Sequence, residues 1–363
     1  MSDRPTFIFI TCQAGAEQAV KAELDRAGAA VRLAFSRPGF LTLKLPDEHG
    51  LMTDFDPGVV FARSWGFSLG KVSGDDIARL AQEAWALNAG RPVRRVHAWP
   101  RDARPPGDRD FEPGLTDAAI AAHAALVKHC PADIELAERS RDPRAAARRG
   151  EFVLDCVLVE PDEWWIGYHR AHRGPTTWPG GIPPLKPPPD MISRAWLKTE
   201  EAIWWSRFPI GKRSPRAAEL GSAPGGSTQA LLARGCEVIG VDPAEMDPRV
   251  ADHPRFRHIR QRASDVRRRE FRKTRWLLAD MNVAPQYTLD SVESIVTHTQ
   301  VSIRGMLLTL KLPEWHLAAE LHEHAARVES WGFNQIALRQ LAFNHQEVCL
   351  AALKRPFRRN RPG

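Results

Sequence analysis

A glycine-rich loop between a predicted strand and a predicted helix constrains the fold more than any other feature of this chain. The loop reads E-L-G-S-A-P-G-G-S-T over residues 219–228; it follows an apolar run at 216–220 and opens a helical pattern at 226–234. A further strand-like run, 237–242, comes next. A strand, a glycine turn, a helix and a second strand form the opening unit of a doubly wound parallel sheet. Such a turn lets a ligand approach the backbone and the free amides of a helix N-terminus.

The same alternation of strands and helices continues after this unit, which predicts an α/β domain with a parallel sheet. The last two apolar runs, 335–341 and 347–353, are separated by a loop too short for a crossover helix, so we expect an antiparallel hairpin at the end of the sheet. The other elements expected after residue 242 are strands at 256–260, 276–280 and 306–310 and helices at 289–302 and 314–331.

The N-terminal half has a different pattern, in which short strands are less regularly spaced. Residues 7–45 predict a small β-α-β-β unit of ferredoxin-like type, and 61–169 predict further strands and two helices. The segment GPTTWPGGIPPLKPPP at 174–189 is too rich in Pro and Gly for the interior of a helix or sheet. The predicted domains are an N-terminal unit at 1–72, a second α+β module at 73–173, a Pro/Gly-rich linker at 174–190 and an α/β domain at 191–363.

The charge balance favours a polyanionic partner. The 363 residues include 51 Lys and Arg against 44 Asp and Glu, a net charge of +7 with a pI near 9.4. Ten of the residues at 255–275 are basic and two are acidic, and the last ten residues carry five bases. Solvated surface and a frayed tail remain the alternative interpretations. In the N-terminal half, a phosphate-binding ridge is expected from the arginines at 139, 141, 144, 148 and 149.

The five cysteines show no CxxC spacing and no pairing pattern, so we expect neither a disulfide framework nor a metal site. A reducing cytoplasm fits this usage. The first residues lack the order of a signal peptide and no apolar run approaches membrane-spanning length. We therefore expect a cytoplasmic protein with no membrane partner. The sequence does not define an oligomeric state, and a monomer is the expectation.

The glycine loop favours a cofactor without phosphate. It lacks the G-x-G-x-x-G order of a dinucleotide site and the Lys-Ser/Thr of a P-loop, and S-adenosylmethionine is the common cofactor of the remaining class. Asp242 follows Gly226 by 16 residues, close to the spacing at which an acid meets a ribose hydroxyl pair. Asp265, after the third strand, could accept from an adenine amino group or cap a basic helix. The expected cofactor loop is Gly221, Ala223, Pro224, Gly225 and Gly226.

Two lysines and two acids converge on the same edge of the predicted sheet. Asp280 ends a parallel strand, Lys311 follows the next one, and Glu347 starts an antiparallel strand at the edge where parallel strands finish. Lys198 comes from a helix at 193–206 that precedes the first strand. Taken singly, each residue could be a helix cap, a strand end or a solvated position.

This set of residues suits the methylation of a hydroxyl group. A ribose hydroxyl is a weak acid, so the site must accept its proton and stabilise the developing charge. Lys311 is the predicted general base, with Lys198 lowering the pKa of Lys311 by its positive charge. Asp280 and Glu347 would orient the two amino groups and the hydroxyl.

Several short motifs accompany these residues. They are S-R-A-W-L-K (193–198), L-G-S-A-P-G-G (220–226), A-D-M (279–281), L-K-L-P (310–313), R-Q-L with Q-E-V (339–348), W-P-G-G-I-P-P-L-K (178–186) and F-A-R-S-W (61–65). The motifs resemble those of a known family, the large-subunit ribosomal RNA cytidine 2'-O-methyltransferases (RlmM), which carry a Lys-Asp-Lys-Glu set.

The resemblance implies a ferredoxin-like unit, a THUMP RNA-binding module and a Rossmann-like methyltransferase domain that acts on rRNA. It also implies cofactor contacts at Ser193, Ala223 to Gly226, Asp242, Asp265 and Asp280, with Lys311 as proton acceptor. This chain departs from the family at Glu219, Ala223 and Ser227, where Asp, Cys and Trp are common.

Two other functions stay open at this point. A nicotinamide oxidoreductase would share the sheet and Asp242, but it would need the three-glycine order and has no use for the lysine pair. A catalytically inactive RNA-binding or ribosome-assembly protein would keep the fold without turnover. A protein or DNA methyltransferase is disfavoured because the segment after the fourth strand reads Asp-Met-Asn-Val and lacks an N/D-P-P-Y-type signature.

Overall fold

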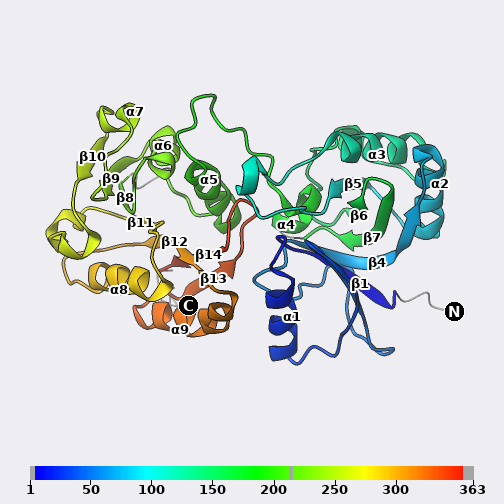
Figure 1. The fold of residues 1–363 in the computed structure, drawn as a ribbon, viewed down its shortest axis with the longest axis horizontal. Coiled ribbons are helices and arrows are strands. Elements are labelled where there is room, and N and C mark those ends of the chain that lie inside the picture. The colour runs from blue at the N-terminus through cyan, green and yellow to red at the C-terminus, as the bar shows by residue number, and fades with distance from the viewer. Residues whose placement is uncertain (1–4, 173, 212–215, 355–363) are drawn as a thin grey trace, which may run out of the picture. The chain divides into compact units, whose positions relative to one another are not determined.

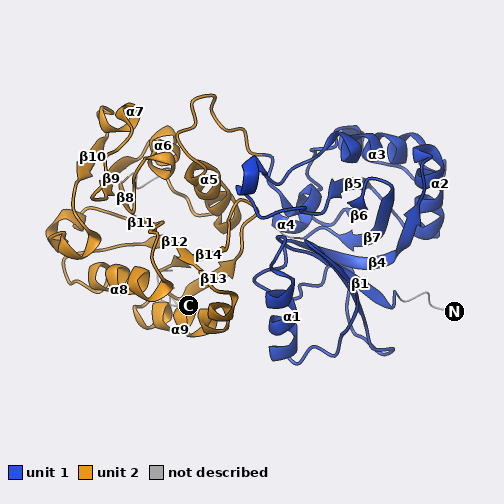
Figure 2. Cartoon of the chain, in the orientation of Figure 1, with its two compact units in different colours: residues 1–184 blue, residues 185–363 orange. Residues whose placement is uncertain are grey.

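A computed structural model describes residues 5–172, 174–211 and 216–354. The chain forms two compact units, residues 1–184 and 185–363 (Figure 2). Each unit is built on its own seven-stranded sheet. In the described part of the chain, no helix is long and apolar enough to cross a membrane.

The sheet of the first unit is mostly antiparallel and has the order β2-β3-β1-β4-β7-β6-β5; Figure 1 labels its strands β1, β4, β5, β6 and β7. Helices α2 and α3 pack on β5 and β4 around an apolar cluster that includes Leu80, Trp85 and Trp164. Asp76 caps α2 by accepting from the backbone N–H groups of Ala78 and Arg79. The elements are β1 (Phe7–Thr11), α1 (Glu17–Arg26), β2 (Arg32–Arg37), β3 (Phe40–Lys44), β4 (Ser64–Ser73), α2 (Ile77–Asn88), β5 (Arg95–Pro100), η1 (Asp108–Asp110), α3 (Asp117–Lys128), η2 (Glu138–Arg141), β6 (Phe152–Glu160) and β7 (Glu163–Arg170).

The boundary predicted between residues 72 and 73 falls inside strand β4, so the structure has one compact unit where the sequence predicts two modules. β4 pairs with β1 on one side and with β7 on the other. A strand that hydrogen-bonds to both neighbours joins them in one sheet, because its backbone groups are shared between the two ladders. Pairings between strands so far apart in sequence leave no local signal.

The Pro/Gly-rich segment is also more regular than predicted. It begins with a short helix α4 (Gly174–Thr177) and a 3-10 turn η3 (Pro179–Gly181). The His169 ring contacts the Thr176 carbonyl oxygen at 2.8 Å, which ties α4 to strand β7. The division between the two units, at residues 184 and 185, falls within the predicted linker.

The sheet of the second unit has the order β10-β9-β8-β11-β12-β14-β13. Strands β8 to β12 run parallel, and β14 is antiparallel to both β12 and β13. Helices α5 and α6 cover one face, and α8 and α9 cover the other (Figure 1). The elements are α5 (Ala195–Ser206), β8 (Arg216–Leu220), α6 (Gly226–Ala233), β9 (Glu237–Val241), α7 (Pro248–Ala251), β10 (Phe256–Ile259), η4 (Ala263–Asp265), η5 (Arg268–Phe271), β11 (Trp276–Ala279), α8 (Pro285–Val296), β12 (Gly305–Lys311), η6 (Trp315–Glu320), α9 (Leu321–Ser330), β13 (Gln335–Arg339) and β14 (Glu347–Leu353).

This order confirms the predicted alternation and the closing hairpin, and it corrects two helices. The helix predicted at 289–302 starts earlier, at Pro285, since a proline at the first turn needs no hydrogen-bonded N–H. The helix predicted at 314–331 is divided into η6 and α9. Leu278, Leu307 and Leu231 belong to the apolar core of this unit.

Candidate active site

The carboxyl edge of the parallel strands carries the residues that the sequence singled out. Asp280 directly follows β11, and Lys311 is the last residue of β12. Glu347 is the first residue of β14 and lies directly opposite Lys311 in the antiparallel ladder. Residues opposite each other on two paired strands point to the same face, so the register itself brings this acid to the lysine.

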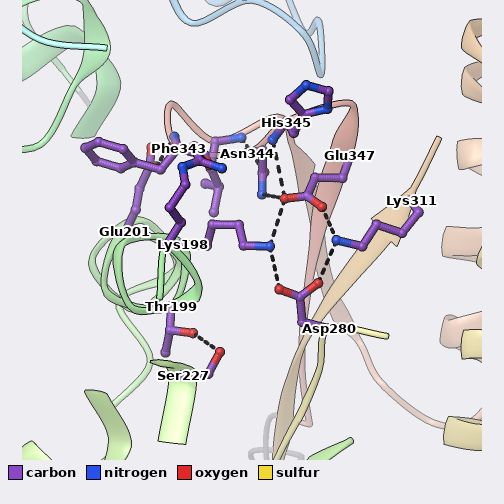
Figure 3. A network of polar contacts seen from close by, with 12 residues as sticks. Lys198, Thr199, Glu201, Ser227, Asp280, Lys311, Phe343, Asn344, His345 and Glu347 are labelled. Atoms are coloured by element: carbon purple, nitrogen blue, oxygen red, sulfur yellow. Dashed lines mark hydrogen bonds and ion pairs between the residues drawn. The ribbon is translucent and has the colours of Figure 1, made fainter. Parts of the chain in front are cut away.

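The two lysines and the two acids form a closed ring of alternating charge, shown in Figure 3. Lys198 Nζ lies 2.5 Å from Asp280 Oδ2 and 3.1 Å from Glu347 Oε1. Lys311 Nζ lies 2.8 Å from Asp280 Oδ1 and also contacts Glu347 Oε2. The side chains are between 3 and 22 % exposed, so each ammonium group exchanges most of its water for carboxylate oxygens. The convergence predicted from the strand order is confirmed by this geometry.

The electrostatics of the ring correct one expectation. Burial alone would lower the pKa of Lys311, but the charges and hydrogen bonds of Glu347 and Asp280 outweigh it and raise that pKa well above its usual range. The pKa of Lys311 is thus raised and not lowered as predicted, because the two carboxylates in contact with its ammonium group outweigh any lowering by Lys198. Lys311 is therefore an ammonium at neutral pH in this state of the protein.

Glu347 is the most buried member of the ring. Burial raises the pKa of its carboxyl, but the positive charges of Lys198 and Lys311 dominate and lower it to about 2. The Asn344 side chain donates to Glu347 Oε1 at 3.2 Å and the His345 backbone N–H at 3.4 Å. Glu347 is thus held as a carboxylate with partners on both oxygens.

The loop between β13 and β14 is held in place by an acid that the sequence analysis missed. Glu201 on α5 is 2 % exposed and accepts from the backbone N–H groups of Ala342 and Phe343, at 2.8 and 3.0 Å (Figure 3). Asn344 accepts from the backbone N–H of Leu341 at 2.8 Å. The position of Glu201 three residues after Lys198, on the same helix face, was the available signal.

The glycine loop packs tightly against two neighbouring segments. Gly221 has φ +76°, and a Cβ there would lie 2.6 Å from the carbonyl oxygen of Asp280. A Cβ on Gly226 would lie 2.2 Å from Ser193 Oγ. The Ser193 hydroxyl is buried at the start of α6, and among the described residues its oxygen has no hydrogen-bond partner. A free hydroxyl at a helix N-terminus suits a polar ligand group.

A cavity of about 820 Å³ opens beside this loop and reaches Asp280. Asp242, which follows β9, lines it and accepts from the backbone N–H groups of Ala223 and Ala244, at 3.2 and 2.8 Å. The wall also includes Gly221, Arg262 and Ser264. Its size and its mixture of backbone, carboxylate and apolar groups fit a nucleoside-type cofactor such as S-adenosylmethionine.

Three other predicted cofactor residues, Asp265, Pro224 and Gly225, do not line this cavity. Asp265 accepts from the Ser264 hydroxyl at 2.8 Å and is not among the residues that line the cavity. The helix that Asp265 was expected to cap is only the 3-10 turn η5, whose N-cap residue is Arg267. Pro224 and Gly225 form the turn into α6, with a cis peptide bond between Ala223 and Pro224, and are not among the lining residues either.

A second cavity, of about 440 Å³, also borders the ring. It is lined by Lys311 and Glu347 together with His345 and Gln346 from the β13–β14 loop. Asn282 and Val283 line both cavities. The ring thus borders both cavities, with Asp280 lining the larger one and Lys311 and Glu347 lining the smaller one. In the part of the chain that the structure describes, no group of three or more His, Cys, Asp or Glu residues could hold a metal ion.

Glu219, one of the positions that depart from the family pattern, is a buried acid behind the ring. Burial raises its pKa to about 8. Thr228 donates to its Oε2, and the Thr199 hydroxyl donates to Ser227 at 2.9 Å beside it (Figure 3). At neutral pH this side chain is largely uncharged, so it adds little negative charge to the nearby ring.

We expect the stability of the protein to fall between pH about 5 and about 8 because of Glu219. An acid with a raised folded-state pKa binds its proton more tightly when folded, so folding is favoured below that pKa and weakened as pH rises through the window. Glu219→Gln should remove the part of this dependence that comes from Glu219, with a gain on the order of 2–5 kcal/mol over wild type at about pH 8.5. Urea denaturation at several pH values measures it. Glu245→Gln, at an exposed position, is the control, and equal pH profiles for wild type and Glu219→Gln would contradict the assignment.

The fold and the site together define a class: the second unit has the Rossmann-like fold of methyltransferases. Residues 191–337 match the model of the family described as FtsJ-like methyltransferase.

The related proteins carry a more specific name than the family model does. The chain is 32 % identical over 190 residues to "Ribosomal RNA large subunit methyltransferase M" of Halorhodospira halophila, covering 51 % of this chain and 53 % of that one. It is 26 % identical over 361 residues to the protein of the same name from Cellvibrio japonicus, covering 94 % and 97 %. In the first of these alignments the chain spans about half the length of its relative. Among solved structures, TrmN from Thermus thermophilus is similar at 12 % identity, with a TM-score of 0.35 and coverage of 96 % of this chain and 99 % of that one.

Proposed function

We propose that this protein is an S-adenosylmethionine-dependent ribose 2'-O-methyltransferase that acts on a cytidine of large-subunit (23S) ribosomal RNA. The observation that carries the proposal is the Lys-Asp-Lys-Glu ring, which borders two cavities, one beside a glycine loop and one beside Lys311. Related proteins named ribosomal RNA large subunit methyltransferase M support the substrate class.

The larger cavity is the proposed cofactor site. S-adenosylmethionine supplies, when bound, a methyl group on a sulfonium centre that an oxygen atom can attack. Asp242 would accept from the ribose hydroxyls of the cofactor, and the backbone of Gly221 and Ala223 would allow its close approach. The free Ser193 hydroxyl and the N-terminus of α6 are suited to its polar end. Asp265 and the turn residues Pro224, Gly225 and Gly226 complete the proposed set.

The smaller cavity is the proposed site of the acceptor nucleotide. A ribose placed there has its 2'-hydroxyl next to Lys311 Nζ, and its base next to the exposed His345 ring and the Gln346 amide. Stacking on a ring and hydrogen bonding to the base edge are the usual means of reading a single RNA base. Asn282 and Val283, which line both cavities, would lie close to both donor and acceptor.

Lys311 is the proposed proton acceptor, and it must first lose the proton that the ring stabilises. A cationic group bound beside Asp280 competes for the same carboxylates and so lowers the pKa of Lys311. The neutral amine would then accept the hydroxyl proton while the oxygen bonds to the methyl carbon and the carbon–sulfur bond of the cofactor breaks, which would leave a neutral thioether. Asp280 and Glu347 hold the new ammonium in place, and Lys198 keeps the charge of the site balanced.

The first unit is the proposed RNA-binding part, with a ferredoxin-like region at its start and a THUMP-like module after it. The five arginines of the predicted ridge, at 139, 141, 144, 148 and 149, are all exposed. Exposed arginines on one short segment suit contacts with successive phosphates.

The test uses the purified full chain, labelled S-adenosylmethionine and unmethylated large-subunit rRNA. Label should enter the RNA at one nucleotide. The phosphodiester bond next to that nucleotide should then resist alkaline hydrolysis, because a 2'-O-methyl group blocks its cleavage. Calorimetry should show binding of S-adenosylmethionine and none of NAD. Cofactor and RNA binding without transfer would support the inactive RNA-binding alternative in its place.

A further inference from the structure

A second basic groove lies at the opposite, amino edge of the same sheet. It is a cavity of about 460 Å³ at the starts of β8, β9 and β10 and along the segment before β11. We call it the amino-edge groove; its basic lining residues are Arg216, Arg255, Arg257, Arg269, Arg272 and Lys273. The groove contains five of the ten basic residues at 255–275, and none of these five lines the two cavities of the candidate active site.

The amino-edge groove keeps an excess of positive charge after its internal ion pairs are formed. Its six bases face two acids, Glu237 and Glu270, which leaves a net charge of +4. Glu237 pairs with Arg216 at 2.7 Å, and Glu270 pairs with Arg257 at 2.9 Å. Arg272 donates at 3.0 Å to the neutral amide of Gln300, which does not cancel its charge. This charge favours a polyanion.

The shape of the groove favours nucleic acid over other polyanions. Its floor is apolar, with the buried Val238 and the half-buried Phe256 ring, while Lys273 and all the arginines except the half-buried Arg216 are exposed. An apolar or aromatic floor with a cationic rim matches bases flanked by phosphates. Arginine forks also bind phosphate oxygens two at a time.

The groove is separate from the active site. Strand β11 runs between Thr274, which lines the groove, and Asp280 in the ring. Six steps of extended chain at about 3.3 Å each separate the two by roughly 20 Å. A single nucleotide cannot reach both, so a ligand of the groove is a different segment of the RNA from the one that enters the active site.

We propose that the amino-edge groove binds the phosphate backbone of an rRNA segment other than the methylated one. This inference rests on the proposed function for its choice of RNA. It assigns the second unit a role in substrate affinity that is independent of the reaction.

The test compares the wild type with R257A/R272A/K273A, using in-vitro transcribed large-subunit rRNA and fluorescence anisotropy from about 50 to about 300 mM KCl. The slope of log affinity against log salt should fall in magnitude by about 2, since each phosphate contact contributes roughly 0.7–0.9. Affinity near 150 mM KCl should drop at least about tenfold. The value of kcat at saturating RNA and the affinity for S-adenosylmethionine should stay within about twofold of wild type.

Two controls distinguish RNA binding at the groove from the effect of the overall charge of the protein. K186A/R249A/R327A removes the same formal charge from exposed or half-exposed positions outside the groove and should change the slope by less than about 1. R257K/R272K keeps both charges and should keep the wild-type slope. If the triple groove variant unfolds early on heating, K273E gives the same comparison with one exposed residue.

An unchanged slope in the groove variants overturns the inference, and so does an equal loss in the control triple. If polyglutamate binding falls in the groove variant while the RNA slope does not, the groove binds an acidic protein segment and the inference is wrong. Failure of the proposed function looks different: the wild type would then transfer no methyl group, whatever the salt dependence of RNA binding.

Discussion

Replacing Lys311 with alanine is expected to reduce methyl transfer by at least about 10²–10⁴-fold, the usual contribution of a positioned acid–base group. The binding of S-adenosylmethionine should stay within about threefold, because Lys311 lines the smaller cavity and not the cofactor cavity. Single-turnover transfer to rRNA and calorimetry with the cofactor give the two measurements. Transfer at the wild-type rate would assign the proton acceptor to another group.

Lys311→Arg is the matched control for the charge of this position. It keeps a cation beside Asp280 and Glu347 but cannot accept a proton near neutral pH. We expect a stable protein that is as inactive as the alanine variant. If Lys311→Arg is active, the position acts only through its charge.

The wild-type rate should also rise with pH. Since the ring raises the pKa of Lys311, the neutral amine is a minor form at pH 7 and increases about tenfold for each pH unit. We expect log kcat/KM, which reports the free protein, to rise with a slope near 1 across the alkaline range in which the protein stays folded. A flat profile would mean that deprotonation of Lys311 does not limit the chemical step.

Replacing Glu347 with glutamine is expected to have the second large effect, on stability and on the pH profile together. Two buried ammonium groups would then share one carboxylate, and breaking a buried ion pair in this way costs about 3–5 kcal/mol. The pKa of Lys311 should fall, so the alkaline rise in rate should move to lower pH. Urea denaturation at neutral pH and the pH dependence of kcat/KM measure the two effects.

The stability difference between wild type and Glu347→Gln should itself depend on pH. The folded-state pKa of Glu347 is about 2, below the ordinary value of 4.5, so its stabilising effect is complete above about pH 5 and is lost as pH falls toward 2. The two proteins should therefore converge in stability in acid. Glu329→Gln, an exposed position on α9, should match wild type at every pH. A constant gap down to about pH 2 would show that the Glu347 charge does not stabilise the fold.

Much of the second unit could be predicted because its signals are local. Apolar runs bounded by turns marked β8, β9, β11 and β12, and the glycine loop marked the start of α6. The short β13–β14 loop allowed only a hairpin, and an antiparallel β14 had to start where the parallel strands end. This inference from strand direction was enough to predict that Glu347 lies beside Lys311.

Other features depend on contacts that leave no local pattern. The pairing of β4 with β1 and β7 joins two predicted modules in one sheet, and a parallel pairing of β5 with β6 lies at its edge. The pKa of Lys311 depends on how closely the oxygens of Asp280 and Glu347 approach its nitrogen, which spacing along the chain does not determine. The support from Glu201 to the β13–β14 loop is likewise visible only in three dimensions.

The strand order at the end of the sheet has a consequence for protein synthesis. β14 is translated after β13 yet lies between β12 and β13. A nascent chain that ends at Arg339 therefore holds Lys198 and Lys311 with one acid partner in place of two. Glu347 joins the other three residues only when this late strand inserts, so a partly translated chain lacks the complete charge ring of the proposed active site.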